Sequence, residues 1–273
     1  MRIISGRQNP TVRLFRTLAT DADVSGARLL LDGAHLVEEA RTAGLSFEVA
    51  AVASSRLAGD TEEGRLALAL ERDGVEVLMA PDQLFAVLSP VKTPSGIVAI
   101  ASRTPVTAAG ICGDPHALVL VAVDVQDPGN LGAVLRAAEA GGVTGALVCG
   151  SAGRGSANPF SWKALRGSMG SVLRLPVAAG LDVTAALDIL DSAGARTVAA
   201  VARDGIDPDT MDWIGRVAIV LGGEGPGLPD QVISRCTARV TIPMAPRVES
   251  LNVAVAGAVL VYAARRARLG AST

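Results

Sequence analysis

The sequence predicts an α/β protein with two domains. The chain has 273 residues, which is enough for two domains of ordinary size. Its second half contains short, continuously hydrophobic runs separated by helical stretches, as is typical of parallel strands that helices cover on both faces. Its first half alternates shorter strands and helices. We therefore expect a small α/β domain followed by a larger one with a mostly parallel sheet.

The first half is predicted to hold four strands and three helices. The strands are expected at Arg28–Leu31, Phe47–Ala53, Val75–Met79 and Gly96–Ala101, and the helices at His35–Thr42, Glu62–Arg72 and Asp82–Leu88. Prolines and glycines are then concentrated between residues 102 and 115, which indicates a linker. We place the first domain at residues 1–105, the linker at 106–116 and the second domain at 117–273.

The second half is predicted to hold five strands and three helices. The strands are expected at Leu118–Val123, Ala146–Val148, Thr197–Val201, Val217–Leu221 and Arg239–Ile242, and the helices at Leu131–Ala140, Thr184–Ala193 and Ser250–Arg268. The last helix is apolar nearly all round from Leu251 to Ala264. We expect it to be buried in the domain, in an interface between two subunits, or in both.

Composition excludes several kinds of site. Hydrophobic residues make up 49% of the chain and charged residues 19%, so a disordered chain is excluded. The two histidines and three cysteines have no metal-binding spacing, so we expect no metal, no disulfide and buried cysteines. Phosphate-binding loops, nucleophile elbows and dinucleotide fingerprints are absent from the sequence.

The sequence also predicts where the protein works. The first ten residues lack the apolar segment of a signal peptide. The most apolar stretch is shorter than the ~20 residues that a membrane span needs. We therefore expect a cytoplasmic protein with no membrane partner.

Charge points to a nucleic acid only through its distribution along the chain. The net charge of −2 does not by itself favour a nucleic-acid partner. Residues 1–20, however, carry four arginines and no acidic residue. Cations without counter-charges suit contacts to phosphates, so we predict that these residues bind the phosphates of a nucleic acid. They are Arg2, Arg7, Arg13 and Arg16.

The first of three motifs spans Asp124 to Gly142. A buried strand ends at Asp124, and Asn130 stands where the N-cap of the next helix is expected. Arg136 lies about 100° from its apolar neighbour Leu135 and so faces the helix margin. The alternative interpretation is a capping Asn and a solvated Arg without further function.

The other two motifs follow later strands. Four glycines surround Glu224 between residues 222 and 227, so the backbone there approaches something closely or adopts positive φ, unless this is a plain Gly-rich turn. In the third motif, Ile242 to Met244 end a strand, and Ser250 and Asn252 open the terminal helix. Ser250 could also be simply an N-cap.

In this order and spacing, the motifs resemble the SpoU (TrmH-like) branch of the SPOUT RNA methyltransferases. The resemblance is carried by N-x-G at Asn130–Gly132 with Arg136, by the glycine-flanked Glu224, and by I-P-M followed by S-L-N at Ser250–Asn252. It covers about residues 115–268, and the segment Ser161–Val177 is similar to the family's middle segment. The first half resembles the substrate-binding domain that often precedes this catalytic domain, an α/β module like certain ribosomal and RNA-kink-binding proteins.

The resemblance implies a fold and an activity. It implies a C-terminal domain with a deep trefoil knot, which is an exception to the rule that chains avoid knots. It also implies a homodimer that transfers a methyl group from S-adenosylmethionine to a ribose 2′-hydroxyl of RNA. Large-subunit rRNA is the expected substrate, because a separate RNA-binding module comes first. The alternatives are a tRNA ribose 2′-O-methyltransferase and a non-catalytic RNA-binding or ribosome-assembly protein.

Site residues follow from the same resemblance. The implied catalytic residues are Asn130, Arg136, Glu224, Ser250 and Asn252. The implied cofactor-binding residues are Leu221, Gly222, Gly223, Ile242, Met244 and Leu251. Arg136 is the family's usual base, but a guanidinium with a pKa above ~12 suits phosphate anchoring or oxyanion stabilisation better. Because every implied site residue lies after the linker, we expect the second domain to fold and dimerise without residues 1–105.

Overall fold

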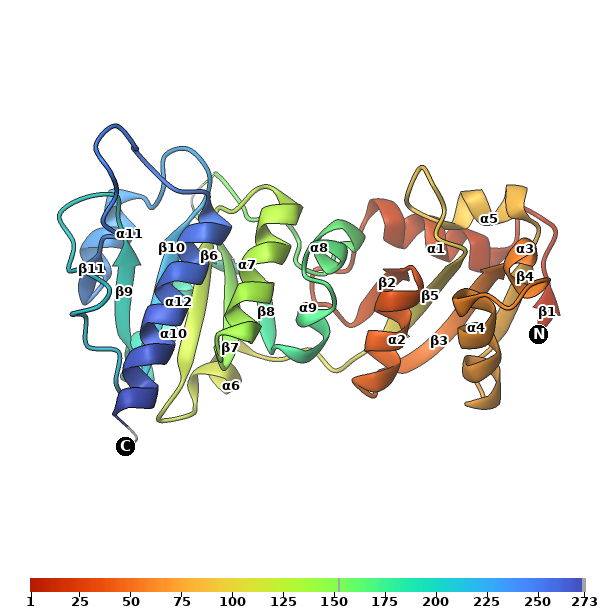
Figure 1. Cartoon of the computed structure of the whole chain (residues 1–273), viewed down its shortest axis with the longest axis horizontal. Coiled ribbons are helices and arrows are strands. Elements are labelled where there is room, and N and C mark those ends of the chain that lie inside the picture. Colours follow the sequence, from red (N-terminus) through yellow and green to blue (C-terminus); the bar gives the residue numbers. More distant parts are fainter. Residues whose placement is uncertain (152, 272–273) are drawn as a thin grey trace. The chain divides into compact units, whose positions relative to one another are not determined.

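The structure, a computed structural model, describes residues 1–151 and 153–271 and divides into two compact units (Figure 1). The first unit consists of Met1–Pro105 and Phe160–Leu173, and the second of Val106–Pro159 and Arg174–Thr273. The chain therefore passes between the units three times, after residues 105, 159 and 173.

The first unit is built on a mixed five-stranded sheet in the order β1-β4-β3-β5-β2. Neighbours β1, β4 and β3 run parallel, whereas β5 is antiparallel to both β3 and β2. The strands are β1 (Arg2–Ile3), β2 (Arg28–Asp32), β3 (Ser46–Ala53), β4 (Val77–Ala80) and β5 (Ile97–Ser102). All four predicted strands of the first half are present, and the edge strand β1 is an addition.

Helices flank this sheet. They are α1 (Pro10–Thr20), α2 (Ala34–Thr42), α3 (Ser54–Leu57), α4 (Glu62–Arg72), α5 (Asp82–Leu88) and α8 (Trp162–Gly167). All of them except α3 bury apolar side chains. The predicted helices match α2, α4 and α5. Helix α1 was not predicted, although Asn9 caps it and Phe15 is fully buried against the sheet. Residues 10–20 are thus a packed helix.

Residues 160–173 enter the core of the first unit from the middle of the sequence. Phe160 is 1% exposed, and the guanidinium of Arg103 lies 4.7 Å from the centre of its ring. A Cβ on Gly26 would come within 2.8 Å of the same ring, so only glycine fits there. On α8, Arg166 lies 3.7 Å from the buried carboxylate of Asp32. Nothing in the sequence pattern indicates this excursion.

The second unit is built on a parallel six-stranded sheet in the order β11-β9-β10-β6-β7-β8. The strands are β6 (Leu118–Val123), β7 (Gly145–Gly150), β8 (Val177–Asp182), β9 (Arg196–Ala200), β10 (Val217–Gly222) and β11 (Ala238–Val240). The prediction of an α/β fold with a parallel C-terminal sheet is confirmed. Strand β8 was missed because only its first two residues are buried and its second half contains Gly180 and Asp182. The trefoil knot stays a prediction.

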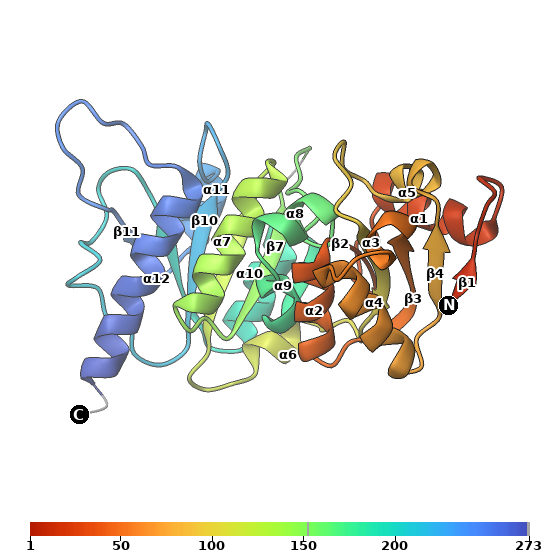
Figure 2. The same ribbon diagram turned by 45° about the vertical axis from the view of Figure 1, so that its right-hand side comes forward.

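Helices cover both faces of this sheet. They are α6 (Ala108–Cys112), α7 (Pro128–Ala140), α10 (Val183–Ser192), α11 (Asp230–Arg235) and α12 (Val253–Gly270), and α9 (Ser171–Arg174) lies at the last passage between the units. Helices α6, α10 and α11 bury apolar side chains on one face. Helices α7 and α12 pack side by side on the other (Figure 2). Helix α6 fills part of the predicted linker, where Ile111 is buried.

The terminal helix α12 is buried on one side only. Leu260, Val261 and Ala264 are fully buried, as expected for a core helix. Its other side exposes Val255, Val259 and Tyr262, of which 49%, 39% and 42% of the surface is accessible. The described residues contain no helix that is long and apolar enough to cross a membrane.

Candidate active site

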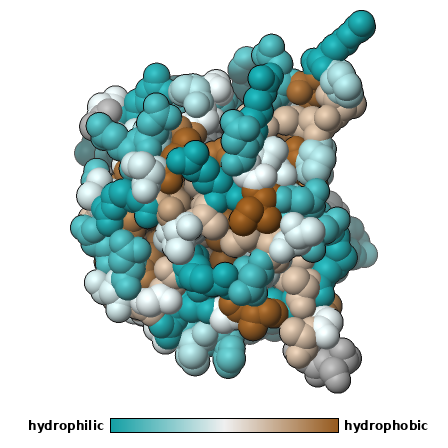
Figure 3. All heavy atoms as spheres, turned by 90° about the vertical axis from the view of Figure 1, so that its left-hand side faces the viewer, coloured by the Kyte–Doolittle hydropathy of each residue, from teal (hydrophilic) through white to brown (hydrophobic). Residues whose placement is uncertain are grey.

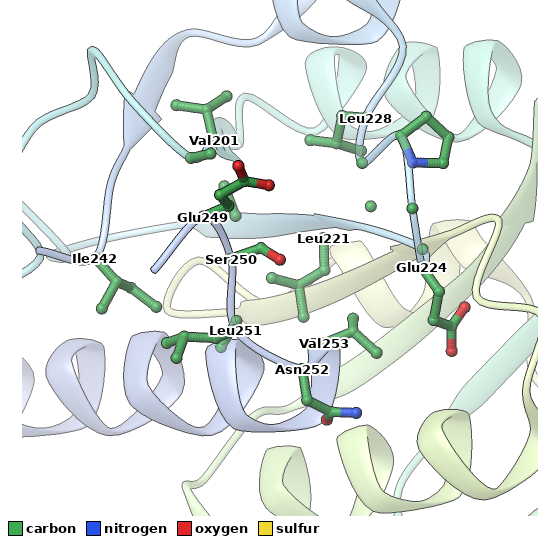
Figure 4. A pocket seen from close by; sticks show the side chains of 18 of the residues that line it. Val201, Leu221, Glu224, Leu228, Ile242, Glu249, Ser250, Leu251, Asn252 and Val253 are labelled. Carbon is green, nitrogen blue, oxygen red and sulfur yellow. The ribbon is translucent and has the colours of Figure 1, made fainter. Parts of the chain in front are cut away.

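A cavity of about 600 Å³ opens at the carboxyl ends of β9, β10 and β11 and reaches the start of α12 (Figure 4). Open parallel sheets bind ligands at this edge, and the volume suits a small organic molecule. The residues predicted to bind the cofactor all line it. They are Leu221, Gly222, Gly223, Ile242, Met244 and Leu251.

The loop after β10 approaches other backbone so closely that it needs glycine. A Cβ on Gly222 would overlap the backbone of Gly227 and Leu228, and one on Gly223 would overlap the carbonyl of Asp124. Gly223 and Gly227 form an antiparallel bridge. The loop therefore folds back on itself at the cavity edge, as the glycine pattern predicted.

Polar side chains from all three motifs meet beside this loop. Asn130 donates from Nδ2 to Oε1 of Glu224 at 2.8 Å, and the N–H of Gln126 donates to Oε2 of Glu224 at 3.1 Å. Asn252 donates from Nδ2 to Oδ1 of Asn130 at 3.1 Å. Glu224, Asn130 and Asn252 therefore form one hydrogen-bonded row, which we call the polar triad.

The polar triad keeps Glu224 ionised. Partial burial alone would raise the pKa of this carboxyl. Hydrogen bonds from Asn130 and from the backbone of Gln126 and Asp127 outweigh burial, so the pKa lies below its ordinary value. The cavity edge thus carries a fixed negative charge at neutral pH.

The prediction that Asn130 is a helix N-cap was wrong, and the alternative that Ser250 is simply an N-cap does not hold, so both side chains are available to the site. Helix α7 begins at Pro128 with Asp127 as its N-cap, and the Asp127 carboxylate accepts from the N–H of Asn130 at 2.7 Å. The side chain of Asn130 is therefore free to bind Glu224. Helix α12 is capped by Asn252, whose Oδ1 accepts from the N–H of Ala254 at 2.9 Å, and Ser250 lines the cavity instead.

A second hydrogen-bonded group supports the strand end before Gln126. Asp124, only 7% exposed and at φ +56°, accepts from the N–H and the hydroxyl of Ser151. The hydroxyl of Ser156 accepts from the N–H of Val125 at 3.0 Å and donates to the carbonyl of Cys149 at 2.7 Å. Sequence reasoning missed both serines, because hydroxyl groups in a loop carry no pattern of their own.

Glu249 is a further residue that sequence reasoning did not assign to the site. It lines the cavity and contributes a carboxylate to a wall that is otherwise largely apolar around Val201 and Leu228 (Figure 4). The available signal was its position directly before Ser250. The described residues hold no group of histidine, cysteine and acidic side chains that could bind a metal.

Arg136 does not join the polar triad within one chain. It lies six residues after Asn130 on α7, which places its Cα about 9 Å further along the axis and about 240° around it. Its side chain is exposed, and among the described residues no hydrogen bond or ion pair to its guanidinium is found. The other four predicted catalytic residues lie at the cavity edge.

The four arginines predicted to bind RNA are all exposed on the first unit. Arg2 forms an ion pair with Glu76 at 2.6 Å, so its charge is already balanced. Arg13 donates to the side chain of Gln8 at 2.6 Å. Arg7 and Arg16 have no acidic partner among the described residues. Three of the four cations are thus left for an external anion.

Comparison with known proteins gives a consistent result. The profile of the SpoU rRNA Methylase family matches residues 117–262. The chain is 34% identical to an uncharacterized tRNA/rRNA methyltransferase of Synechocystis, over 99% of this chain and 96% of that protein. It is 28% identical to the 23S rRNA (guanosine(2553)-2′-O)-methyltransferase of Bacillus subtilis, over 96% and 98% of the two chains. The crystal structure of an AdoMet-bound rRNA methyltransferase from Sinorhizobium meliloti superimposes with a TM-score of 0.81 at 25% identity, covering 97% of each chain.

Proposed function

The chain belongs to the SpoU rRNA methylase family, and from this we propose that it methylates a guanosine of 23S rRNA. It is an RNA ribose 2′-O-methyltransferase that uses S-adenosylmethionine. The observation that carries the proposal is the adjacency of the cavity to the polar triad, because it puts a small-molecule site next to fixed polar groups. The named substrate of the full-length Bacillus subtilis relative supports 23S rRNA over tRNA.

The residues present fit S-adenosylmethionine. The cavity of about 600 Å³ is within the range of sites for molecules of this size. We propose that Leu221, Ile242 and Leu251 enclose the adenine and that the backbone around Gly222 and Gly223 supplies its hydrogen bonds. The bound cofactor supplies the electrophilic methyl group.

The chain's own residues must position a poor nucleophile. A ribose hydroxyl has to be held in line with the methyl group. As the new O–C bond forms, the methyl–sulfur bond has to break and the hydroxyl proton has to pass to a base or to solvent. We propose that the polar triad and Ser250 hold the ribose at the cavity edge. Arg136 anchors a phosphate or stabilises the developing oxyanion, because a guanidinium does not release its proton at neutral pH.

We also propose that the protein is a homodimer. Val255, Val259 and Tyr262 recur at helical spacing on the exposed side of α12, and such apolar stripes usually meet a second copy. Figure 3 shows apolar side chains among hydrophilic ones on one face of the second unit. Because α7 packs beside α12, we propose that a dimer through these helices brings Arg136 to the partner's cavity.

The first unit has the features of an RNA-binding module. Arg13 and Arg16 lie exposed on α1, and Arg7 precedes this helix. We propose that these cations contact RNA phosphates and that Arg2, already paired with Glu76, contributes less. Residues 1–105 and 160–173 would then be the RNA-binding domain, and the rest of the chain from 106 the catalytic domain. The cytoplasm, where rRNA is made and modified in bacteria, is the proposed location.

Methyl transfer from labelled S-adenosylmethionine tests this function. Purified 23S rRNA that lacks 2′-O-methylation should accept label from the native chain, and mapping should place it on a guanosine ribose. The Glu224→Ala variant is the matched control and should transfer little. If only tRNA is labelled, the substrate is tRNA and not rRNA. Binding of RNA without any transfer would favour a non-catalytic assembly protein.

A further inference from the structure

Arg247 has a backbone conformation that favours glycine. Its φ is +81°, and it is one of four described non-glycine residues with positive φ. The N–H of Val248 donates to the carbonyl of Ala245 at 3.1 Å, so residues 245–248 form a turn. Pro246 in the second position and a positive φ in the third are the pattern of a type II turn, whose third residue is usually glycine. An arginine there costs free energy that glycine would not.

The turn lies at the mouth of the cavity but outside its wall. Met244 before the turn and Glu249 after it both line the cavity, whereas residues 245–248 do not. Arg247 is exposed, and no hydrogen bond or ion pair to its guanidinium is found in the part of the chain that the structure describes. The side chain therefore has no structural partner that would explain its presence.

We propose that Arg247 binds an RNA phosphate next to the ribose that receives the methyl group. A strained position that keeps a long cation instead of glycine indicates that the charge itself is used. RNA brings one phosphate per nucleotide to this edge, and an exposed guanidinium at the cavity mouth can meet it. This inference rests on the proposed function, because it takes RNA to be the molecule at the cavity mouth.

The location favours RNA over the carboxylate of the cofactor. That carboxylate would lie within the cavity, and Arg247 is not among the residues that line it. Glu249, the acidic residue nearest to Arg247 in the sequence, points its carboxylate into the cavity (Figure 4). Arg247 thus binds the substrate and not the cofactor.

Two variants separate the charge of Arg247 from its strain. Arg247→Gly removes both, so we expect a higher melting temperature together with an about tenfold higher KM for RNA, which corresponds to ~1.4 kcal/mol. Arg247→Gln keeps the strain and removes the charge. It should therefore raise the KM for RNA by the same factor without raising the melting temperature. In both variants kcat and the calorimetric affinity for S-adenosylmethionine should stay unchanged. The number of counterions released on RNA binding, which the salt dependence of the affinity measures, should fall by about one.

Two controls match these changes elsewhere. Met169→Gly relieves a φ of +50° without removing a charge, so it is the control for the melting temperature, which should rise as in Arg247→Gly. Arg216→Gln removes a cation next to the amino end of β10, at the edge of the sheet away from the cavity, so KM should stay the same.

The outcomes distinguish this inference from the proposed function. If the native chain transfers no methyl group, the proposed function fails, and RNA binding by the variants still tests Arg247. An unchanged KM and salt slope in Arg247→Gln, with transfer intact, would overturn the role of Arg247. A weaker affinity for S-adenosylmethionine in both variants would overturn it too and assign the guanidinium to the cofactor carboxylate.

Discussion

Asn130 donates a hydrogen bond of 2.8 Å to Glu224, and this bond joins segments that are 94 residues apart in the sequence. The same amide accepts from Asn252, which is 122 residues further along the chain. A neutral amide between a carboxylate and a second amide uses both its donor and its acceptor. Asn130 is thus the central member of the polar triad, and its removal should break a hydrogen bond of each of the other two members.

Asn130→Ala should raise the pKa of Glu224 towards its ordinary value, because the side-chain hydrogen bond that lowers it is removed. A lowered carboxyl pKa stabilises the folded protein above the ordinary pKa, and this contribution is lost as pH falls through the lowered value. In the variant this contribution should be smaller, and its loss should be complete at a higher pH. NMR titration of the Glu224 carboxyl checks this, with Ser250→Ala as the control, and identical titrations of variant and native protein would contradict it.

The meeting of the three motifs could be predicted from sequence because parallel strands share one carboxyl edge. The hydrophobic segments that form β6 and β10 could be located from the sequence. Because these strands are parallel neighbours, Asn130 after β6 and Glu224 after β10 lie near each other. The start of α7 was misplaced by three residues, although Asp127-Pro128 is itself a good start signal. Because Arg136 and Asn130 lie six residues apart on one helix, helical periodicity also predicts that their side chains point in different directions.

The packing of residues 160–173 with the first unit could not be predicted in this way. Phe160 is buried by Gly26 and Arg103, which are more than fifty residues away and belong to no shared pattern. Contacts of this kind depend on three-dimensional complementarity, which periodicity does not encode. Helix α1 is a different case, because Val12, Phe15 and Leu18 already recur at helical spacing behind Asn9-Pro10.

Phe160→Ala should destabilise the first unit by about 3–5 kcal/mol, since it leaves a large cavity under Gly26. Chemical denaturation measures this, and Lys163→Ala, an exposed change nearby, is the control. The same burial revises the expectation for the chain that lacks residues 1–105. Its Phe160 and Leu165 would be exposed, so we now expect it to be less stable or to aggregate. A fully stable truncated chain would show that residues 160–173 do not need the first unit.

Leu251→Arg should weaken binding of S-adenosylmethionine strongly, because it places a cation among the apolar residues of the cavity wall. The surface variant Arg65→Ala breaks only the exposed pair with Asp60 and should bind normally. Isothermal calorimetry compares the two. Equal affinities would mean that the cofactor lies elsewhere.

Val259→Glu should convert the proposed dimer into a monomer, because it buries a charge in the middle of the apolar stripe on α12. Light scattering should then give a mass near the 27.7 kDa of one chain. Val106→Glu alters a residue of similar exposure, 37%, away from α12 and should leave the dimer intact. A native protein that already has the monomer mass would refute the interface.

Arg136→Ala should abolish methyl transfer while leaving the affinity for S-adenosylmethionine nearly unchanged, because Arg136 is absent from the cavity wall. Arg136→Lys keeps the charge but loses the planar fork, so substantial activity in this variant would favour simple phosphate anchoring. A parallel loss of cofactor affinity in Arg136→Ala would instead make Arg136 a cofactor contact.

Mixed dimers test whether Arg136 serves the partner's cavity. Arg136→Ala and Glu224→Ala chains are each expected to be inactive alone. If Arg136 acts across the interface, a mixed dimer has one site that lacks both groups and one that keeps both, so about half of the sites of each mixed dimer should work. If Arg136 acts within its own chain, each site of the mixed dimer lacks one group and no activity should return. Because Arg136 lies about 9 Å along α7 from Asn130 and faces away from the polar triad, we expect recovery.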